Sequence, residues 1–119
     1  MRVDGETVLL DIGSTTTDIL RLRDGSVDCR GRDDLSRLAC GELVYTGVVR
    51  TPVFAVCAEV PYRGAWQPLV PEWFATMGDV HRLLGELGPE DDLMPTADGR
   101  GKDAPASAAR LARALGTDL

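Results

Sequence analysis

The sequence predicts an α/β fold, and three observations lead to that prediction. Two short apolar stretches, residues 7–12 and 18–23, flank a turn and are typical of a β-hairpin. Between residues 71 and 87, apolar residues recur at steps of three and four, as on one face of a helix, and Pro71 suits its first turn. The stretch 106–116 is rich in Ala, Leu and Arg, which are strong helix formers.

The predicted hairpin opens the chain. Its first strand, TVLLDI, is almost entirely apolar, which is the pattern of a strand that is covered on both faces. The second strand, DILRLR, alternates apolar and charged residues. The dipeptide Asp24-Gly25 then predicts a tight turn into a third strand, SVDC.

A mixed segment of helix and strand follows the hairpin. Residues 33–43 predict a short helix, with an aspartate near its N-cap and Gly41 near its end. Residues 53–60, VFAVCAEV, predict a strand that Pro61 closes, because the proline ring removes a backbone donor. A length of 119 residues suits one domain, and its expected parts are a hairpin (6–30), an α+β segment (31–87), a polar loop (88–105) and a helix (106–116).

Charge and composition exclude several classes of protein. A formal net charge of -6 argues against a nucleic-acid-binding domain, which needs basic residues to neutralise phosphates. The sequence contains neither the ~20 successive apolar residues of a membrane span nor a signal peptide's apolar core, so we expect a cytoplasmic protein. Cys29, Cys40 and Cys57 contain no C-x-x-C pair, which favours buried, reduced thiols over a disulfide framework or a zinc site.

The turn of the hairpin carries glycine and hydroxyl residues between two aspartates, in the stretch DIGSTTTD. Gly13 leaves room at the backbone, and the amides and hydroxyls of residues 14–17 can form a concave nest for a phosphate oxygen. Asp11 can hold Mg²⁺ through water, and Asp18 can orient the loop or a catalytic water. The alternative is a plain hairpin whose hydroxyls bond to local amides. The residues alone leave both interpretations open.

DIGSTTTD resembles the second phosphate-binding hairpin of the actin/Hsp70/sugar-kinase ATPase superfamily, in its hydantoinase A/oxoprolinase branch. Three more stretches resemble hydantoinase/oxoprolinase-like proteins linked to tetrahydromethanopterin-dependent C1 transfer and to the condensing enzyme of methanofuran synthesis. These stretches are GELVYTGVVRTPV (41–53), FATMGDVH (74–81) and TADGRGKDAPASAARLAR (96–113). The resemblance extends from Val8 to about Leu115.

This resemblance implies a ribonuclease H-like fold, namely a partial C-terminal lobe of an actin-like ATPase with the hairpin first and an inserted α+β segment. The superfamily's first phosphate loop and adenosine-binding segment have no counterpart in this sequence. We therefore expect a missing N-terminal lobe or a split partner chain, and no turnover by the isolated 119 residues. The implied ligands are a small-molecule substrate, Mg²⁺, and ATP or an organic diphosphate.

The resemblance also implies roles for individual residues. It implies a catalytic role for three residues, Asp11, Asp18 and His81. Asp11 is also the implied metal ligand. Five would contact the nucleotide or diphosphate: Gly13, Ser14, Thr15, Thr16 and Thr17. Six would face the substrate: Tyr45, Thr46, Arg50, Asp79, Asp98 and Arg100.

Simpler interpretations of several residues stay open. His81 can equally be a surface or packed histidine, and Arg50 is either a buried arginine that pairs with an anion or a strand-edge residue with its head in solvent. We expect Lys102 and the acidic residues 90–92 to be solvated, and Trp66 and Trp73 to pack rather than bind a ligand.

The favoured function is part of a condensing enzyme of C1-carrier metabolism, which displaces pyrophosphate or uses ATP with Mg²⁺. An alternative is a non-catalytic module that binds a nucleotide or a partner. A third is a fragment that is stable only with its missing half and that exposes an apolar interface.

Overall fold

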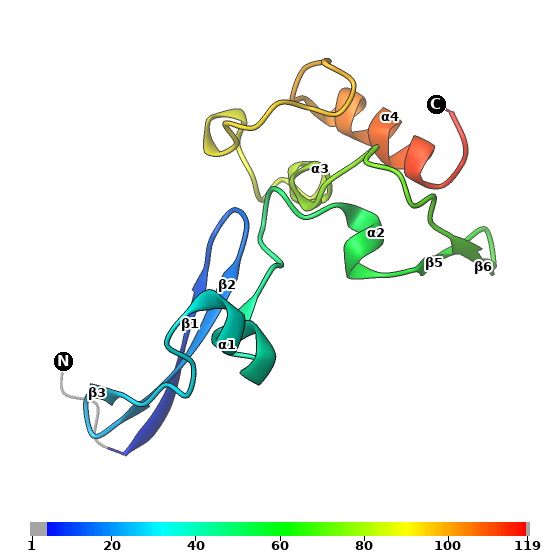
Figure 1. The fold of residues 1–119 in the computed structure, drawn as a ribbon. Helices are drawn as coiled ribbons and strands as arrows, with labels where there is room; N and C mark the ends of the chain where they lie inside the picture. Colours follow the sequence, from blue (N-terminus) through cyan, green and yellow to red (C-terminus); the bar gives the residue numbers. More distant parts are fainter. Residues whose placement is uncertain (1–4, 119) are drawn as a thin grey trace. The chain divides into compact units, whose positions relative to one another are not determined.

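The computed structural model describes residues 5–118 and has two compact units, residues 1–47 and 48–119 (Figure 1). Unit 1 is built on the predicted hairpin, β1 (Glu6–Ile12) and β2 (Thr17–Arg23), whose antiparallel register runs from Glu6–Arg23 to Ile12–Thr17. The turn after β2 is the predicted one, because Asp24 and Gly25 have φ angles of 50° and 78°, as a type I′ turn requires.

Two very short strands complete the sheet of unit 1. β3 (Ser26–Val27) pairs with the end of β2, and β4 (Leu43–Val44) pairs with its beginning. β2 is therefore the central strand, and β3 and β4 share its second edge. All of these pairings are antiparallel.

Helix α1 (Asp34–Cys40) confirms the predicted short helix. The Asp33 carboxylate accepts a hydrogen bond from the Ser36 backbone N at 2.8 Å, which satisfies one of the free amides of the first turn. Gly41 ends the helix with a φ of 77°, a left-handed conformation that glycine adopts without cost.

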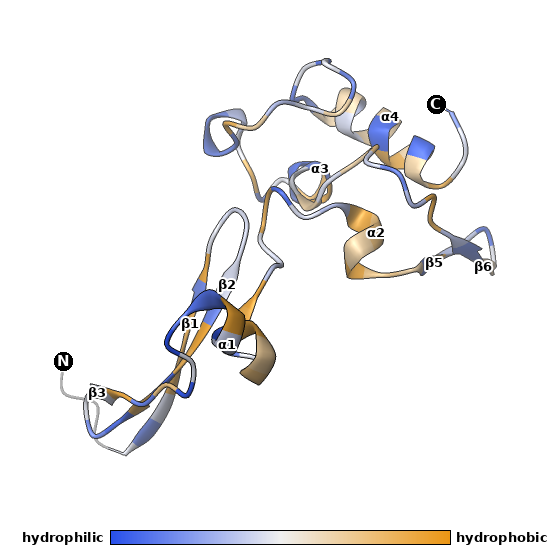
Figure 2. Cartoon of the chain, in the orientation of Figure 1, coloured by the Kyte–Doolittle hydropathy of each residue, from blue (hydrophilic) through white to orange (hydrophobic). Residues whose placement is uncertain are grey.

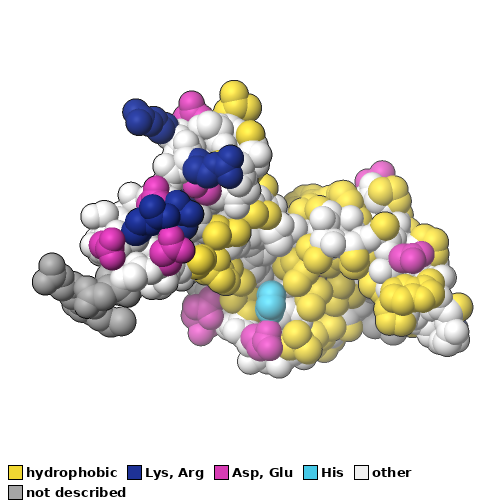
Figure 3. All heavy atoms as spheres, turned by 90° about the horizontal axis from the view of Figure 1, so that it is seen from below, with side chains coloured by type: hydrophobic (Ala, Val, Ile, Leu, Met, Phe, Trp, Pro, Cys, Tyr) yellow, Lys and Arg dark blue, Asp and Glu magenta, His cyan; other side chains and the backbone are white. Residues whose placement is uncertain are grey.

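The prediction that the first strand is covered on both faces is wrong for the described residues. Val8, Leu10 and Ile12 point to one face of β1 and Leu9 to the other, and all four are exposed. The apolar pattern predicts a covering layer that the other described residues of unit 1 do not supply. Figure 2 shows the hydrophobic residues along β1 and β2, and the surface seen in Figure 3 carries broad groups of hydrophobic side chains.

Unit 2 places short elements around a small core. Its elements are α2 (Val53–Val56), β5 (Glu59–Tyr62), β6 (Ala65–Pro68), α3 (Met77–Leu83), a 3-10 helix (Pro89–Asp91) and α4 (Ala104–Ala114). β5 and β6 form an antiparallel ribbon, and α3 packs against α4. The buried core residues are Val53, Ala75 and Ala114, with Leu69, Phe74, Met77, Val80 and Leu111 packed against them.

The predicted strand over 53–60 is wrong in its first half, which forms α2. Pro52 is the N-cap of α2, and Cys57 returns to an extended conformation, so the strand begins only at Glu59. Pro61 lies inside β5, paired with Trp66, rather than closing the strand. A two-stranded ribbon tolerates this proline because each strand has an open edge.

The helix predicted over 71–87 is much shorter, because α3 begins at Met77. The Thr76 backbone N donates to the Asp79 carboxylate at 3.1 Å, and Thr76 itself is extended, so the helix starts after it. Pro71 consequently precedes the helix. The C-terminal helix is confirmed as α4, which begins two residues earlier than expected and is capped by Asp103.

The three cysteines are free thiols, but the expectation of burial is wrong for Cys57, which is exposed. Cys29 and Cys40 are partly buried. Within residues 5–118, the helices lack the length and apolar character that crossing a membrane requires.

Candidate functional site

The hairpin of unit 1 ends in a loop of four residues, 13–16, which we call the tip loop. The Gly13 backbone N donates to the Thr16 carbonyl at 2.8 Å and closes the loop. Gly13 and Ser14 are exposed, and Thr15 and Thr16 are partly buried. The predicted phosphate-binding residues therefore lie at an accessible turn of the backbone.

A second segment of unit 1, residues 46–47, lies directly against the tip loop. The Thr17 hydroxyl donates to the Thr46 carbonyl at 2.7 Å, so this hydroxyl holds the neighbouring segment. A Cβ atom on Gly47 would lie 2.6 Å from the Gly13 carbonyl oxygen and from the Thr15 N, a distance that leaves space only for glycine. Sequence reasoning missed Gly47, although a glycine within an apolar stretch signals a close backbone approach.

Two aspartates stand at the shoulders of the tip loop. Asp11 and Asp18 are direct partners in the β1–β2 register, so their side chains project from the same face of the sheet. Asp18 accepts a hydrogen bond from the Arg37 guanidinium of α1 at 2.5 Å, and this bond raises the pKa of Arg37. Asp11 is exposed.

Arg37 already balances the charge of Asp18, and the exposed Asp11 directly opposite is the carboxylate of this pair that is open to a divalent cation. No group of three or more His, Cys, Asp or Glu residues within residues 5–118 is arranged to hold a metal ion. Mg²⁺ needs no such group, because it is commonly held by one or two carboxylates, water and the phosphates of a substrate. Asp11 and Asp18 can supply that partial shell.

Glu42, within the stretch GELVYTG, fixes the segment that precedes α1. Its carboxylate accepts hydrogen bonds from the backbone N atoms of Arg30 at 2.7 Å and Gly31 at 2.8 Å. These bonds hold the pKa of Glu42 below its usual value. The acidic residue of this stretch is thus engaged by the backbone.

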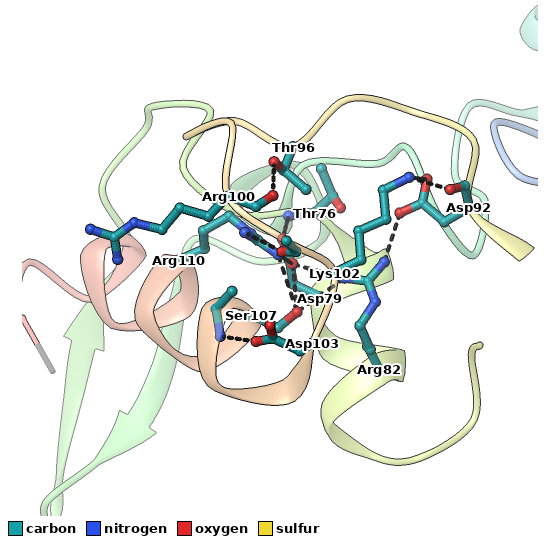
Figure 4. A network of polar contacts seen from close by, with 12 residues as sticks. Thr76, Asp79, Arg82, Asp92, Thr96, Arg100, Lys102, Asp103, Ser107 and Arg110 are labelled. Carbon is teal, nitrogen blue, oxygen red and sulfur yellow. Dashed lines mark hydrogen bonds and ion pairs between the residues drawn. The ribbon is translucent and has the colours of Figure 1, made fainter. Parts of the chain in front are cut away.

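Unit 2 contains a buried network of charged residues centred on Asp79, whose exposed fraction is 4%. One carboxylate oxygen of Asp79, Oδ1, accepts from Arg110 Nη2 at 2.7 Å, Arg110 Nε at 2.9 Å, Arg82 Nη1 at 3.1 Å and the Ser107 hydroxyl at 2.9 Å (Figure 4). The other oxygen accepts from the Thr76 backbone N. The network joins α3 to α4 through a fully hydrogen-bonded carboxylate.

The same arginines hold the two ends of a loop, residues 92–98, which we call the strap. Asp92 is 6% exposed and accepts from Arg82 Nη2 at 2.7 Å, and Lys102 Nζ donates to the Asp92 carbonyl (Figure 4). At the other end, Asp98 accepts from Arg110 Nη1 at 3.0 Å. The expectation that residues 90–92 and Lys102 are all solvated is therefore wrong for Asp92 and Lys102.

The environment of Asp98 changes its acidity. Burial disfavours the charged carboxylate, but hydrogen bonds from the Arg100 backbone N at 3.1 Å and from Arg110 outweigh that effect and hold the pKa of Asp98 below its ordinary value. Asp98 is therefore ionised in the folded protein at neutral pH.

The strap forms one wall of a cavity of about 220 Å³, which we call the unit 2 cavity. Its lining includes Asp79 and Asp92 of the buried network, together with Arg50, Trp73 and residues 94–97. Arg50 is exposed, so the alternative of a buried arginine is wrong. The expectation that the tryptophans pack is wrong for Trp66 of β6, which is 66% exposed, and Trp73 is itself 46% exposed.

The structure places the predicted substrate residues in two groups. Arg50 and Asp79 line the unit 2 cavity, and Asp98 is tied to Asp79 through Arg110. Tyr45 and Thr46 belong to unit 1, where the Thr46 carbonyl accepts from the Thr17 hydroxyl next to the tip loop and Tyr45 is exposed.

Two other predicted residues lie apart from the unit 2 cavity lining. The Arg100 guanidinium points away from the buried network (Figure 4), although its Nε is 3.8 Å from Asp98. His81 Nδ1 lies 2.7 Å from a Glu86 carboxylate oxygen on the partly exposed side of α3. This placement agrees with the surface interpretation of His81.

Comparison with known proteins adds the following findings. The sequence model of the hydantoinase/oxoprolinase family matches residues 1–119. A protein of Methanocaldococcus jannaschii, named "(4-{4-[2-(gamma-L-glutamylamino)ethyl]phenoxymethyl}furan-2-yl)methanamine synthase", is 40% identical over 93% of this chain. A protein of the same name from Methanococcus vannielii is 33% identical over 98% of the chain. The matched regions span 33% and 52% of these relatives, so the chain covers between a third and about half of their length.

Proposed function

The chain belongs to the hydantoinase/oxoprolinase family, and on that premise we propose that it is part of a condensing enzyme whose tip loop holds a diphosphate or nucleotide with Mg²⁺. The observation that carries this proposal is the arrangement of unit 1. An accessible turn of glycine and hydroxyl residues lies between Asp11 and Asp18, which share one face of the sheet.

The name of the relatives describes the chemistry of their product. That product is an aryl ether, in which a phenol oxygen is joined to the methylene carbon of a furan. We propose the same class of reaction for the complete protein of which this sequence forms part. The phenol oxygen attacks the furylmethyl carbon, the bond from that carbon to a diphosphate oxygen breaks, pyrophosphate leaves with the electron pair, and the phenol proton passes to a base.

In this proposal the residues of unit 1 act on the leaving group. The backbone amides and hydroxyls of Ser14, Thr15 and Thr16 bind phosphate oxygens, which carry more negative charge as the bond breaks. Asp11 and Asp18 hold Mg²⁺, which supplies charge neutralisation when bound. Gly47 permits the close packing that fixes the shape of the loop. An ATP-dependent condensation uses the same contacts on a nucleotide.

We further propose that the hairpin belongs to a ribonuclease H-like lobe, as the resemblance to the actin/Hsp70/sugar-kinase superfamily implies. The support is the order of its first elements, an antiparallel hairpin followed by a short third strand.

Isothermal titration of the purified chain with inorganic pyrophosphate, with and without Mg²⁺, tests the proposed function. We expect Mg²⁺-dependent binding that Asp11→Asn and Thr15→Ala each weaken by about tenfold, the loss expected for one charge-assisted contact. Asp34→Asn in α1 and Thr7→Ala at the far end of β1 are the matched controls and should bind like the unchanged chain. Equal affinity in all five proteins would remove the tip loop from the proposal.

A specific observation favours a second function, that of a partner-binding module. Val8, Leu10 and Ile12 are exposed on one face of β1, and soluble proteins rarely leave a row of large apolar side chains uncovered unless it packs against another polypeptide. If the chain is such a module, we expect it to self-associate or to bind another polypeptide. A monomer at all concentrations in sedimentation equilibrium would argue against self-association.

A further inference from the structure

Arg37 of α1 is held in one position by contacts that do not involve the tip loop. Its backbone carbonyl accepts from the Glu42 N at 2.9 Å, and its Nη2 donates to the Glu42 carbonyl at 3.2 Å. A Cβ atom on Gly31 would lie 2.5 Å from the Arg37 Cγ, so the backbone of residue 31 lies directly against the side-chain stem. The Glu42 carboxylate accepts from the Gly31 N at 2.8 Å and keeps that segment in place. The guanidinium is therefore ordered by the protein itself.

This guanidinium pairs with one of the two aspartates at the shoulders of the tip loop. Arg37 Nη2 donates to Asp18 Oδ1 at 2.5 Å, and the two side chains are 20% and 29% exposed. A fully exposed ion pair contributes little, because water screens its charges and both side chains must be ordered. Here the pair is partly shielded and the arginine is already ordered. Asp11, directly opposite Asp18 in the β1–β2 register, is exposed, so two carboxylates and one guanidinium leave a single negative charge.

That single charge decides which form of ligand the shoulders attract. Without Arg37, Asp11 and Asp18 would face each other as like charges, and a bare divalent cation would relieve their repulsion. With Arg37 in place, one uncompensated carboxylate is left for Mg²⁺, an ion that gives up its water reluctantly. No group of three or more His, Cys, Asp or Glu residues in the described part of the chain completes a metal shell. The remaining charge of Asp11 in turn repels a bare diphosphate.

We propose that Arg37 is a positioning residue that makes the tip loop selective for a divalent cation and a diphosphate bound together, over either ion alone. Arg37 acts through Asp18, whose charge it balances, and needs no contact with the ligand. In the combined ligand the cation faces Asp11, and phosphate oxygens supply the metal ligands that one carboxylate cannot. The identity of this ligand rests on the proposed function, whereas the effect of Arg37 on the charge of the shoulders rests on the geometry of unit 1.

The test breaks this ion pair from either side and measures each ion alone, at about 0.15 M salt to screen distant charges. Arg37→Gln leaves both aspartates without their cation. Mn²⁺, which shares the preference of Mg²⁺ for oxygen ligands, should then bind about tenfold more tightly, as measured by electron paramagnetic resonance of the free ion. Asp18→Asn leaves the guanidinium unpaired, so pyrophosphate in metal-free buffer should bind about tenfold more tightly in isothermal titration. If the ion pair were only structural, both variants would weaken binding, because either change would disorder the loop.

Three further variants are the controls. Arg37→Lys keeps the positive charge and should bind Mn²⁺ as weakly as the unchanged chain. Combining Arg37→Gln with Asp18→Asn removes one charge of each sign, so both affinities should return toward those of the unchanged chain. Arg21→Gln breaks another arginine–aspartate pair of unit 1, that of Arg21 with Asp28, and should change neither affinity.

A Mn²⁺ affinity that Arg37→Gln does not raise would overturn the inference, as would a pyrophosphate affinity that Asp18→Asn does not raise. If circular dichroism shows that Arg37→Gln does not fold, the pyrophosphate affinity of Asp18→Asn decides alone. Titration of the unchanged chain with Mg²⁺-pyrophosphate separates the two proposals. Failure of that binding alone refutes the proposed function of the tip loop, whereas failure of the two variants to gain affinity refutes only the role of Arg37.

Discussion

Replacing Arg110 by methionine removes the cation at the centre of unit 2. Arg110 is 1% exposed, and its guanidinium binds Asp79 at 2.7 Å, Asp98 at 3.0 Å and the Gly101 carbonyl at 3.2 Å. Methionine has almost the same helix propensity and is also long, so the change acts mainly on charge and hydrogen bonding. Arg110→Met leaves Asp79 with a single arginine partner, Arg82, and leaves Asp98 with no buried cation.

The size of the effect follows from that geometry. Removal of one partner from a buried ion pair costs about 3–5 kcal/mol, because the remaining charge stays out of water without compensation. The total stability of a domain is about 5–15 kcal/mol, so this loss takes away a large part of it. We expect the free energy of unfolding of Arg110→Met to fall by about 3–5 kcal/mol.

Urea unfolding followed by circular dichroism measures this loss. Arg113→Met, on the same helix but outside the buried network, is the matched control and should change stability by less than about 0.5 kcal/mol. Adding Asp98→Asn to Arg110→Met should recover part of the loss, because it neutralises a carboxylate that has lost its partner. A stability of Arg110→Met close to that of Arg113→Met would refute the buried network.

Three further predictions concern single positions. Gly47→Ala places a Cβ 2.6 Å from the tip loop backbone and should lower the free energy of unfolding by about 1–3 kcal/mol; an unchanged melting temperature would contradict that packing. Gly41→Ala, at a φ of 77°, should cost about 1–2 kcal/mol in urea unfolding, and no change would contradict the left-handed end of α1. The pKa of Asp98 is lower in the folded protein than in the unfolded chain, where an aspartate has a pKa of about 3.9, so its charged form stabilises the fold above that pH. This stabilisation is lost as the pH falls through the pKa that Asp98 has in the folded protein. Asp98→Asn should therefore flatten the fall of the urea midpoint below about pH 4, and an unchanged acid slope would contradict the shift.

The elements that sequence reasoning predicted well are those with local signals. Asp24-Gly25 dictates its turn because glycine and aspartate tolerate positive φ, and Asp33 with Gly41 defines both ends of α1. The register of β2 with β3 follows from the Asp24-Gly25 turn, because Arg23 pairs with Ser26. These interactions join residues close in sequence, so a pattern is enough to find them.

The helix predicted over 71–87 shows where periodicity misleads. Phe74 and Met77 follow a helical spacing and both pack on the core, yet Phe74 precedes the N-cap at Thr76 and only Met77 lies in the helix. The cap depends on the Asp79 carboxylate, which also receives two arginines. A pattern of apolar residues carries no information on that bond.

The buried network could not be predicted because its members lie far apart in sequence. Ser107 and Arg110 are 28 and 31 residues from Asp79. Charged residues usually lie at the surface, so arginines in a helix are expected to be solvated. The resemblance pointed to Asp79 and Asp98, but the cation that joins them, Arg110, became visible only in the structure.

Amide chemical shifts of the chain during titration with Mg²⁺-pyrophosphate test most directly whether the hairpin binds phosphate. We predict that the largest shifts fall on residues 13–17 and on Gly47, because their amides surround the anion. Shifts of equal size without Mg²⁺, or shifts confined to surface arginines such as Arg63 and Arg113, would contradict a built site at the tip loop.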